Sequence, residues 1–539
     1  MKQLNNILFA CFACCGLVAA TTSCSEDTYD PDPAKDWAGT AYYFESVDNQ
    51  GFFTYYNPAN GRCGDPMPFY DPKAQEFKVL YLQEYETNPA CYHPFWGVAT
   101  KDGANYTPLN EVLPTGSSLK QQDMVLGTGC AVYNEQDGLY YIYYTGYNMH
   151  LPNREVVMRA TSSDFKTWQK DGAWMLRGTE YGYSANDFRD PQVFKADDGL
   201  WHMVISSSLK FAEFKSSDLK NWEHVGQFNM VWDRMCECPD VFKMGDWWYL
   251  VYSEAYKADW SRKVKYMMAD SWENLKKCFD DPGAHWPKDG KEGVLDSRAF
   301  YAGKTASNGT DRFIWGWCPI RIGTTNYEKN VSVGAESEPA WAGALVCHKL
   351  IQHSDGTLTL GAVPAITAKY SKAQPVNVMA SNGYTNGTLS GDGAYVLFNR
   401  LGSNNHISFT VTAADKNDKF GVSMLRGTDS KWYYTMIVNP EDGGNNHKIN
   451  FEEEGPWKEG DPVEDKPKGF IAGIDGYKFA TPADNVYKVD IYTDNSVMVM
   501  YINDNVCYTQ RIYGIQKNCW SINGYGATLK VSDVKVSAN

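Results

Sequence analysis

The sequence predicts an all-β protein, a five-bladed β-propeller followed by a C-terminal β-sandwich. A hairpin, in which an apolar strand turns into an aromatic and β-branched strand, recurs about every 50 to 65 residues. A second motif, a Ser-Asp pair followed a few residues later by a Trp, repeats between the hairpins. This motif indicates a turn at the outer edge of each propeller blade. Past about residue 364 the pattern changes to short alternating strands separated by Gly, Asn and Asp, which is typical of a sandwich. A long sandwich alone would not explain both periodic signals.

Five predicted hairpins define the blades. Their paired segments are 65–70 with 77–82, 130–133 with 139–144, 190–194 with 200–206, 239–242 with 247–253, and 300–304 with 312–317. The outer turns are clearest at 163–168 and 217–222, with looser relatives at 101–102 and 270–272. Each blade of a propeller is a four-stranded sheet, and this spacing is long enough for one. We therefore expect the propeller to occupy residues 41–366.

The C-terminal part, residues 367–539, is predicted to form the sandwich. Its strands are expected at 394–398, 406–411, 432–438, 487–492 and 499–504. Residues 369–383 are rich in Ser, Ala, Lys and Asn and contain Pro375, which indicates a linker. Such a sandwich either binds sugar or supports the propeller, and support is the favoured interpretation.

Composition and charge exclude some classes of partner. The chain has 539 residues, of which 43% are hydrophobic, so it can bury a large core and is expected to form two domains. A net charge of -15 argues against nucleic acid or an anionic membrane surface as partner, because both would repel the protein. We expect a monomer.

Ten cysteines follow the N-terminal leader, and they show no spacing typical of metal ligands. We interpret most of them as small buried hydrophobic residues, assign no disulfide, and predict no metal and no cofactor. Cys236 and Cys238 flank Glu237 at alternate positions. They are therefore expected on one face of a strand, packed beside that acid.

The first residues indicate export. Residues 1–23 contain Lys2 and a short apolar run, as a signal peptide does, and residues 24–40 are a polar tether. The small residues before Cys24 resemble a bacterial lipoprotein signal in which that cysteine is acylated. The acidic residues after it resemble those of Bacteroidetes surface lipoproteins. This implies a lipid anchor in the outer membrane, at the cell surface or on the periplasmic face; the alternative is a plain secretory peptide.

Three acids lie at the starts of predicted inner strands: Asp65, Asp190 and Glu237. In a propeller these strands line the central axis, so acids far apart in sequence would meet in one funnel. Like charges in such a pocket push pKa values apart, and one carboxyl can stay protonated. A carboxylate beside a carboxylic acid is what glycoside cleavage requires. Taken singly, each acid has a structural alternative, either a strand-entry turn or, for Arg189 with Asp190, a buried ion pair.

The order of several motifs resembles glycoside hydrolase family 32, the invertase, inulinase and levanase group. The matching segments are Asp65-Pro66, Arg189-Asp190-Pro191, Glu237-Cys238-Pro239-Asp240, Leu295-Asp296, Phe300-Tyr301-Ala302 and Trp315-Gly316-Trp317, together with Gln83, Trp96-Gly97, Gly127-Thr128-Gly129 and Trp341-Ala342-Gly343. The resemblance implies a retaining β-fructofuranosidase acting on fructans or fructosylated oligosaccharides.

Roles for individual residues follow from that resemblance alone. It implies Asp65 as nucleophile, Glu237 as general acid/base, and Asp190 as the group that stabilises the transition state. Further substrate contacts are expected from Gln83, Trp96, Thr128, Arg189, Asp296, Trp315 and Trp317. For the three tryptophans, packing between blades is the alternative, and Asp296 and Gln83 are equally open.

The chain departs from the family pattern at four positions. Gly64 and Met67 stand where the family usually has asparagines beside the nucleophile, which puts the sugar of the innermost subsite in question. Cys236 replaces a common Trp, and Val499 replaces a usual Glu in the sandwich. Two other functions stay open: an inverting furanosidase resembling family 43, and a non-hydrolytic glycan-binding surface lipoprotein.

Overall fold

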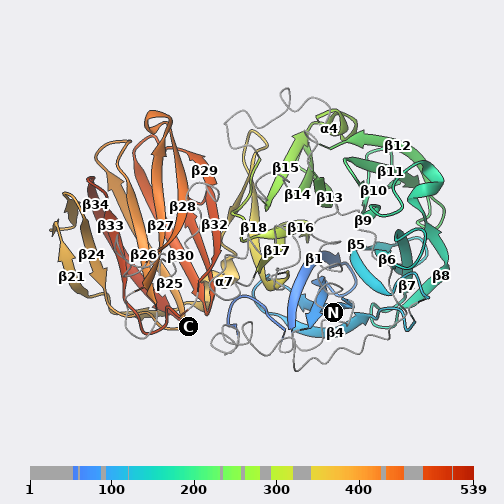
Figure 1. Ribbon diagram of the computed structural model, residues 1–539, viewed down its shortest axis with the longest axis horizontal. Helices are drawn as coiled ribbons and strands as arrows, with labels where there is room; N and C mark the ends of the chain where they lie inside the picture. Colours follow the sequence, from blue (N-terminus) through green and yellow to red (C-terminus); the bar gives the residue numbers. More distant parts are fainter. Residues whose placement is uncertain are drawn as a thin grey trace, which may run out of the picture.

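Two β domains lie side by side in the computed structural model, a propeller and a sandwich (Figure 1). The described residues are 52–58, 61–85, 93–118, 120–230, 235–255, 262–278, 293–319, 341–426, 432–454, 477–512 and 514–539. The predicted signal peptide, Cys24 and the tether lie outside these ranges. Within them, no helix combines the length and the apolar character needed to cross a membrane.

The propeller blades follow one another along the chain. Blade one is β1 (Gly61–Asp71), β2 (Glu76–Tyr85), β3 (Phe95–Thr100) and β4 (Thr107–Leu113). Blade two is β5 (Val125–Asn134), β6 (Leu139–Tyr147), β7 (Glu155–Ser162) and β8 (Gln169–Leu176). Blade three, after the 3-10 helix η1 (Gly178–Tyr181), is β9 (Arg189–Lys195), β10 (Trp201–Ser207), β11 (Lys210–Ser216) and β12 (Glu223–Asn229).

The last two blades complete the domain. Blade four is β13 (Met235–Met244), β14 (Trp247–Ala255) and β15 (Arg262–Ala269), followed by helix α4 (Trp272–Cys278). Blade five is β16 (Tyr301–Ser307), β17 (Arg312–Pro319), β18 (Gly343–Gln352) and β19 (Leu358–Gly361). All five predicted hairpins are present as the first two strands of a blade.

The inner strands form a closed ring. β1 contacts β5, β5 contacts β9, β9 contacts β13, β13 contacts β16, and β16 returns to β1. The ends of the ring are also joined by a ladder contact between Cys63 on β1 and Gly343 on β18. The predicted fold class is confirmed. Residues near the starts of the inner strands therefore face a common axis.

The recurring outer turn has a local physical cause. The Asp164 carboxylate accepts hydrogen bonds from the backbone N–H groups of Lys166 and Thr167, both at 2.8 Å. Asp218 does the same for Lys220 and Asn221, also at 2.8 Å. An Asp that bonds to the backbone two and three residues on stabilises a tight turn, which explains why the motif repeats.

The sandwich consists of two antiparallel sheets. One runs β22 (Tyr384–Thr385), β23 (Thr388–Ser390), β34 (Thr528–Ala538), β25 (Asn404–Ala413), β30 (Val486–Asp494), β31 (Val497–Ile502) and β32 (Val506–Arg511), with β20 (Lys372–Gln374) also paired to β34. The other runs β21 (Val378–Asn382), β24 (Ala394–Phe398), β33 (Trp520–Gly524), β26 (Phe420–Arg426), β27 (Trp432–Glu441), β28 (Asn446–Glu454) and β29 (Tyr477–Ala480).

The predicted linker at 369–383 is wrong. The helix α7 (Pro364–Lys369) leads into β20 and then β21, and both strands pair within the sandwich. Every residue of these two strands is exposed, because each strand is short and lies at the border of its sheet. Exposed strands have a polar composition that resembles a linker.

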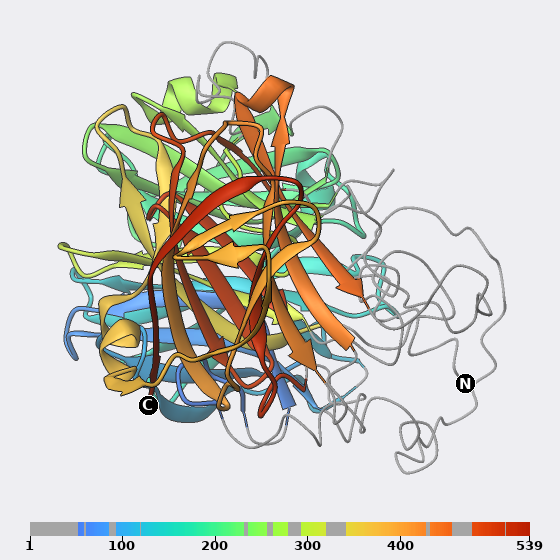
Figure 2. The ribbon, with the colours of Figure 1, turned by 90° about the vertical axis from the view of Figure 1, so that its left-hand side faces the viewer.

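The two domains share a buried interface. A single cluster of buried apolar side chains contains residues of the propeller, such as Leu345, and of the sandwich, such as Tyr501. The Asp494 carboxylate, at the end of β30, accepts hydrogen bonds from the backbone N–H groups of residues 53 to 55. Burial raises the pKa of Asp494 to about 6. In Figure 2 the sandwich lies in front of the propeller.

Candidate active site

Every inner strand of the propeller carries an irregularity near its start. The pairing of the first two strands shifts register at Gly64/Met67, Gly127/Gly129, Val204/Ser206, Glu237/Asp240 and Tyr301/Lys304. Left-handed backbone angles occur at the same places: φ is 38° at Asp65, 60° at Asp190, 52° at Cys238 and 53° at Ala302. A bulge redirects side chains, and strained non-glycine residues are concentrated at functional sites.

The bulges surround one narrow pocket. Asp65, Arg189, Asp190 and Glu237 line it, together with Cys238, Tyr301 and Trp341. The three acids are 8%, 3% and 4% exposed, in sequence order, so they are nearly removed from water yet border a common hollow. The structure thus brings together the three acids and the arginine that the sequence analysis singled out.

Asp65 is held by two neutral donors. Thr128 Oγ1 donates to Asp65 Oδ2 at 2.8 Å, and Trp317 Nε1 donates to Asp65 Oδ1 at 2.9 Å. Each carboxylate oxygen therefore has a fixed partner, from blades two and five respectively. Hydrogen bonds to the charged form stabilise a carboxylate. Thr128 and Trp317, both predicted substrate contacts, thus lie beside the predicted nucleophile.

Glu237 is held by one charged and one neutral donor. Arg189 Nη2 donates to Glu237 Oε1 at 3.1 Å, and the Tyr301 hydroxyl donates to Glu237 Oε2 at 2.7 Å. Because the two donors bind different oxygens, they set the orientation of the carboxyl plane.

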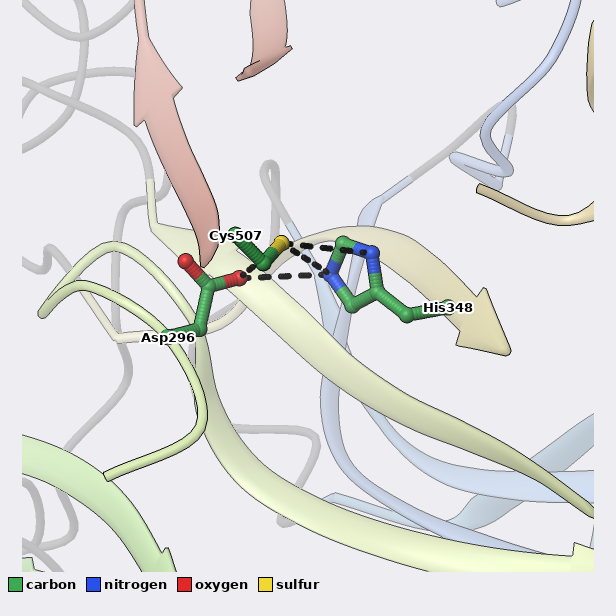
Figure 3. A group of neighbouring side chains, drawn as sticks. All are labelled: Asp296, His348 and Cys507. Atoms are coloured by element: carbon green, nitrogen blue, oxygen red, sulfur yellow. Dashed lines mark hydrogen bonds and ion pairs between the residues drawn. The ribbon is translucent and has the colours of Figure 1, made fainter. Parts of the chain in front are cut away.

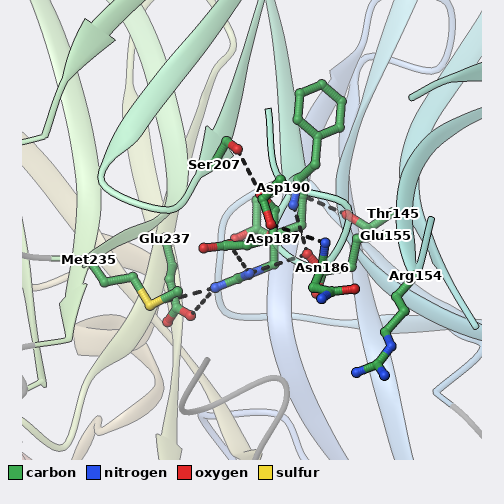
Figure 4. A network of polar contacts seen from close by, with 12 residues as sticks. Thr145, Arg154, Glu155, Asn186, Asp187, Asp190, Ser207, Met235 and Glu237 are labelled. Carbon is green, nitrogen blue, oxygen red and sulfur yellow. Dashed lines mark hydrogen bonds and ion pairs between the residues drawn. The ribbon is translucent and has the colours of Figure 1, made fainter. Parts of the chain in front are cut away.

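Arg189 bonds to three acids, Glu155, Asp187 and Glu237, which are labelled in Figure 4. Its Nη1 lies 3.3 Å from Glu155 Oε2 and also bonds to Asp187, while Nη2 bonds to Glu237. Burial raises the pKa of Glu155 to about 7, and the Arg189 guanidinium acts in the opposite direction. A single buried guanidinium therefore faces three carboxyl groups, and burial favours the neutral form of Glu155.

Asp190 is fixed through the backbone. Its N–H donates to Thr145 Oγ1 at 3.0 Å, and its Oδ2 accepts from the N–H of Cys238 at 2.9 Å. Burial raises the pKa of the Cys238 thiol well above its ordinary value, so this sulfur stays neutral at the pocket wall. Cys238 and Cys236 do not share a face, because the bulge at Cys238 interrupts the alternation and the two belong to different buried clusters.

Farther along the same inner strands, polar side chains fill the propeller axis. Lys304 Nζ donates to the carbonyl oxygen of Gly129 at 3.0 Å and to Gln192 Oε1 at 3.1 Å. Gln192 Nε2 in turn donates to Asp240 Oδ1 at 3.1 Å. This chain of bonds joins blades two, three, four and five beneath the pocket.

Models of two known protein families match most of the chain. The model of the glycosyl hydrolases family 32 N-terminal domain matches residues 56–362, and that of the "GH32, BT1760-like, C-terminal domain" matches residues 356–536. The chain belongs to glycoside hydrolase family 32. It is therefore a glycoside hydrolase with the family's two-domain architecture.

Three proteins show what this family 32 hydrolase is similar to in sequence or in fold. It is 25% identical to the raffinose invertase of Escherichia coli over 466 residues, covering 81% of this chain and 85% of the relative. It is 38% identical over 60 residues to a levanbiose-producing levanase of Geobacillus stearothermophilus, covering 11% and 15% of the two chains. The exo-inulinase of Aspergillus awamori has the same fold, with a TM-score of 0.67, 17% identity, and coverage of 90% and 97%.

Several predicted substrate contacts of the hydrolase lie outside the pocket. Trp315 is fully buried, packs against Phe77 and Phe313, and donates to the Tyr106 hydroxyl at 3.2 Å. Trp96 packs partly buried against the same core cluster, and Gln83 is fully buried on β2 opposite Cys63. The contacts of Trp315 and Trp96 match the packing alternative, whereas the role of Gln83 stays a prediction.

Asp296 lies at the interface between the two domains (Figure 3). It is fully buried, its Oδ1 accepts from the Thr509 N–H at 2.8 Å, and its Oδ2 accepts from Thr509 Oγ1 at 2.6 Å. His348 Nε2 lies 3.2 Å from the same Oδ2. The structure thus places Asp296 as a link between blade five and the sandwich.

Among the described residues, one group of side chains has ligand atoms close enough to hold a metal ion, although the sequence spacing does not indicate it. The ligand atoms of Asp296, His348 and Cys507 all lie within 4.8 Å of one another. Carboxylate, imidazole and thiolate are ligand types that zinc accepts. The three come from a loop, β18 and β32, so only folding brings them together.

Tyr301 and Trp341 are pocket residues to which the sequence analysis assigned no role, although both lie in the family-like motifs it quoted. Trp341 also explains Gly64, because a Cβ added at Gly64 would lie only 2.2 Å from an atom of the Trp341 ring. Trp341 in turn stacks on His93, with ring centroids 4.7 Å apart.

Met67 also departs from the family pattern, and its sulfur accepts a hydrogen bond from the Gly129 N–H at 3.1 Å. The two asparagines are thus replaced by packing residues.

Proposed function

We propose that this protein is a retaining hydrolase of β-fructofuranosyl linkages in fructans or fructosylated oligosaccharides. The observation that carries the proposal is the pocket in which Asp65 and Glu237 face the same hollow with different partners. The names of the relatives, a raffinose invertase, a levanase and an exo-inulinase, support a fructosyl substrate.

In this mechanism Asp65 attacks the anomeric carbon, while the carboxyl of Glu237 gives its proton to the leaving oxygen. Glu237 then takes a proton from water, which hydrolyses the fructosyl-Asp65 ester. The hydrogen bonds from Thr128 and Trp317 hold the Asp65 oxygens in position for attack. Asp190 accepts hydrogen bonds from sugar hydroxyls that strengthen in the transition state.

Glu237 needs to change protonation state during this cycle. Its Arg189 partner favours the ionised form, and the Tyr301 hydroxyl keeps the carboxyl oriented in both forms. The negative charge that Asp65 loses on forming the ester also changes the field at Glu237, which favours its ionised form as the base for the second step.

The test uses Asp65→Asn and Glu237→Gln on levan, inulin and sucrose, with Glu223→Gln as the matched control. Glu223 lies on β12, and its side chain is 74% exposed. We expect each pocket variant to lose about 10³-fold or more in kcat, with the control unchanged. NMR of the first product anomer should show retention. Inversion would contradict the nucleophile assignment, and a wild-type protein that binds but never cleaves these sugars would support the glycan-binding alternative.

We also propose that the protein is exported and lipid-anchored through Cys24 to the outer membrane, and acts there as a monomer. The support is the leader sequence, with small residues before Cys24 and acidic residues after it. Mass spectrometry should find an acylated Cys24 at the mature N-terminus, and Cys24→Ala should release the protein from membranes. Cleavage elsewhere, with an unmodified cysteine, would contradict the anchor.

A further inference from the structure

The sandwich carries a second hollow, on the face of one sheet turned away from the sandwich core. It has a volume of about 360 Å³ and lies over β24, β33, β26 and β27. Ligand pockets usually enclose about 300 to 1,000 Å³, so this hollow is large enough for a small ligand or part of a chain. All of its lining residues belong to the sandwich. We call it the sandwich groove.

Strand alternation produces the groove. Val396, Val422 and Met436 point inward and are buried in the core cluster. On the opposite face, Tyr395 and Tyr525 are 36% and 39% exposed. Between these rings the floor residues Ser423 and Thr435 are only 4% and 1% exposed, so the sheet surface is recessed.

The floor of the groove is a row of bonded polar groups. Asn523 Nδ2 donates to Ser423 Oγ at 2.7 Å, and the hydroxyls of Ser423 and Thr435 lie 2.8 Å apart. Ser521 Oγ donates to Asn523 Oδ1 at 3.0 Å. Hydroxyl and amide groups can each both donate and accept, so this row suits a ligand that is itself rich in hydroxyls.

The described lining of the groove is uncharged, and Lys419 lies beside it, with its Nζ 4.6 Å from the centroid of the Tyr525 ring. None of the eleven described residues that line it is charged. Charged residues are 21% of the chain, so about two would be expected among eleven on composition alone. Three of the eleven are tyrosines: Tyr395, Tyr433 and Tyr525. A neutral, hydroxyl-lined hollow with aromatic rings fits an uncharged ligand that has both hydroxyls and C–H faces, as a sugar ring does.

We propose that the sandwich groove is a second, non-catalytic site that binds the same fructan polymer as the pocket. The inference rests on the proposed function for the identity of the sugar. A chain held there would raise the local concentration of substrate near the propeller, which increases the rate on long polymers and leaves short ones unaffected.

The binding test uses the full chain carrying Glu237→Gln, so that the polymer is not degraded. Its migration is measured in gels containing levan, inulin or, as a non-fructan polymer, xylan. We expect Tyr395→Ala with Tyr525→Ala to raise the dissociation constant at least about fivefold, because both stacking surfaces are lost. Tyr395→Phe with Tyr525→Phe keeps the rings and should bind within about twofold of the parent.

The control is Tyr181→Ala on the propeller, since Tyr181 is also 36% exposed. It should leave binding unchanged. In the chain with Glu237 intact, the alanine pair should slow cleavage of dilute polymer several-fold and leave kcat/KM on the shortest cleaved oligosaccharide unchanged. Circular dichroism and the melting temperature verify the fold of each variant.

The possible failures are distinguishable. If the polymer is hydrolysed but the alanine pair binds and cleaves it as the parent does, the groove proposal is overturned and the proposed function stands. A second outcome is that levan or inulin retards the parent, that the alanine pair abolishes the retardation, and that neither polymer is hydrolysed. In that case the proposed function is wrong and the proposed binding site in the groove is supported. Retardation by xylan alone overturns the fructan assignment of the groove.

Discussion

The propeller pocket and the sandwich groove are both hollows on antiparallel sheets, yet their construction is opposite. The pocket lies among bulged strands with left-handed residues, and three carboxylates and one guanidinium are part of its described lining. The groove lies on β24, β33, β26 and β27, whose mutual ladders show no register shift, and its described lining is neutral. Bond cleavage requires charges held against their mutual repulsion, whereas binding a neutral ligand requires only shape and hydrogen bonds.

The largest effect should come from a change at Arg189, the cation in the described lining of the pocket. We expect Arg189→Met to lower kcat by about 10²- to 10³-fold and to destabilise the fold by about 3 to 5 kcal/mol, since it leaves buried carboxylates without their cation. Arg189→Lys should recover stability better than activity, because an ammonium group lacks the fork that reaches Glu155 and Glu237 together. Steady-state kinetics and thermal unfolding measure the two effects. Full activity in the lysine variant would show that charge alone suffices.

A second contrast concerns pH, because a buried acid with a raised pKa, Glu155, pairs with the pocket residue Arg189, whereas none of the described residues that line the groove is charged. Glu155 has a pKa of about 7 in the folded protein, above its ordinary value near 4.5. The stabilising effect of its protonated form is therefore complete below about pH 4.5 and is lost as pH rises through about 7. Relative to Glu155→Gln, the wild type should lose on the order of 3 kcal/mol across that range.

Melting temperatures of the two proteins, measured at intervals from pH 4.5 to 8, supply this difference. The raised pKa of Asp494 contributes equally to the stability of the wild type and of Glu155→Gln, so its effect cancels in the difference between their melting temperatures. A difference in melting temperature that is constant with pH would show that Glu155 is ionised throughout.

The smallest expected effect tests how tightly the pocket is packed. Gly64→Ala forces the Trp341 ring to move, so we expect a KM raised several-fold and a loss of about 1 to 3 kcal/mol in stability. Gly172→Ala is the matched control, because a Cβ there meets nothing within 4 Å. An unchanged KM in the Gly64 variant would mean that Trp341 does not border the bound sugar. Binding in the groove should be the same in both variants.

The features that the sequence predicts correctly depend on local signals. Hairpins with alternating strands and Asp-stabilised outer turns need only neighbouring residues, and both are present in the structure. The interpretation of most cysteines as buried residues is confirmed, since eight of the nine described are buried. Two predictions are wrong. The linker expected at 369–383 is a pair of short exposed strands with the composition of a linker, and Cys236 and Cys238 do not share a face because a bulge breaks the alternation.

The amino-acid order alone therefore determined the number of blades, the sandwich, and the acids placed at the starts of inner strands, because each depends on short-range periodicity. Only the tertiary structure decided which residues surround those acids. Tyr301 reaches Glu237 from another blade, Trp341 occupies the space above Gly64, and Asp296 lies against the sandwich instead of the pocket. Such contacts join residues far apart in sequence, and their geometry depends on how blades and domains pack.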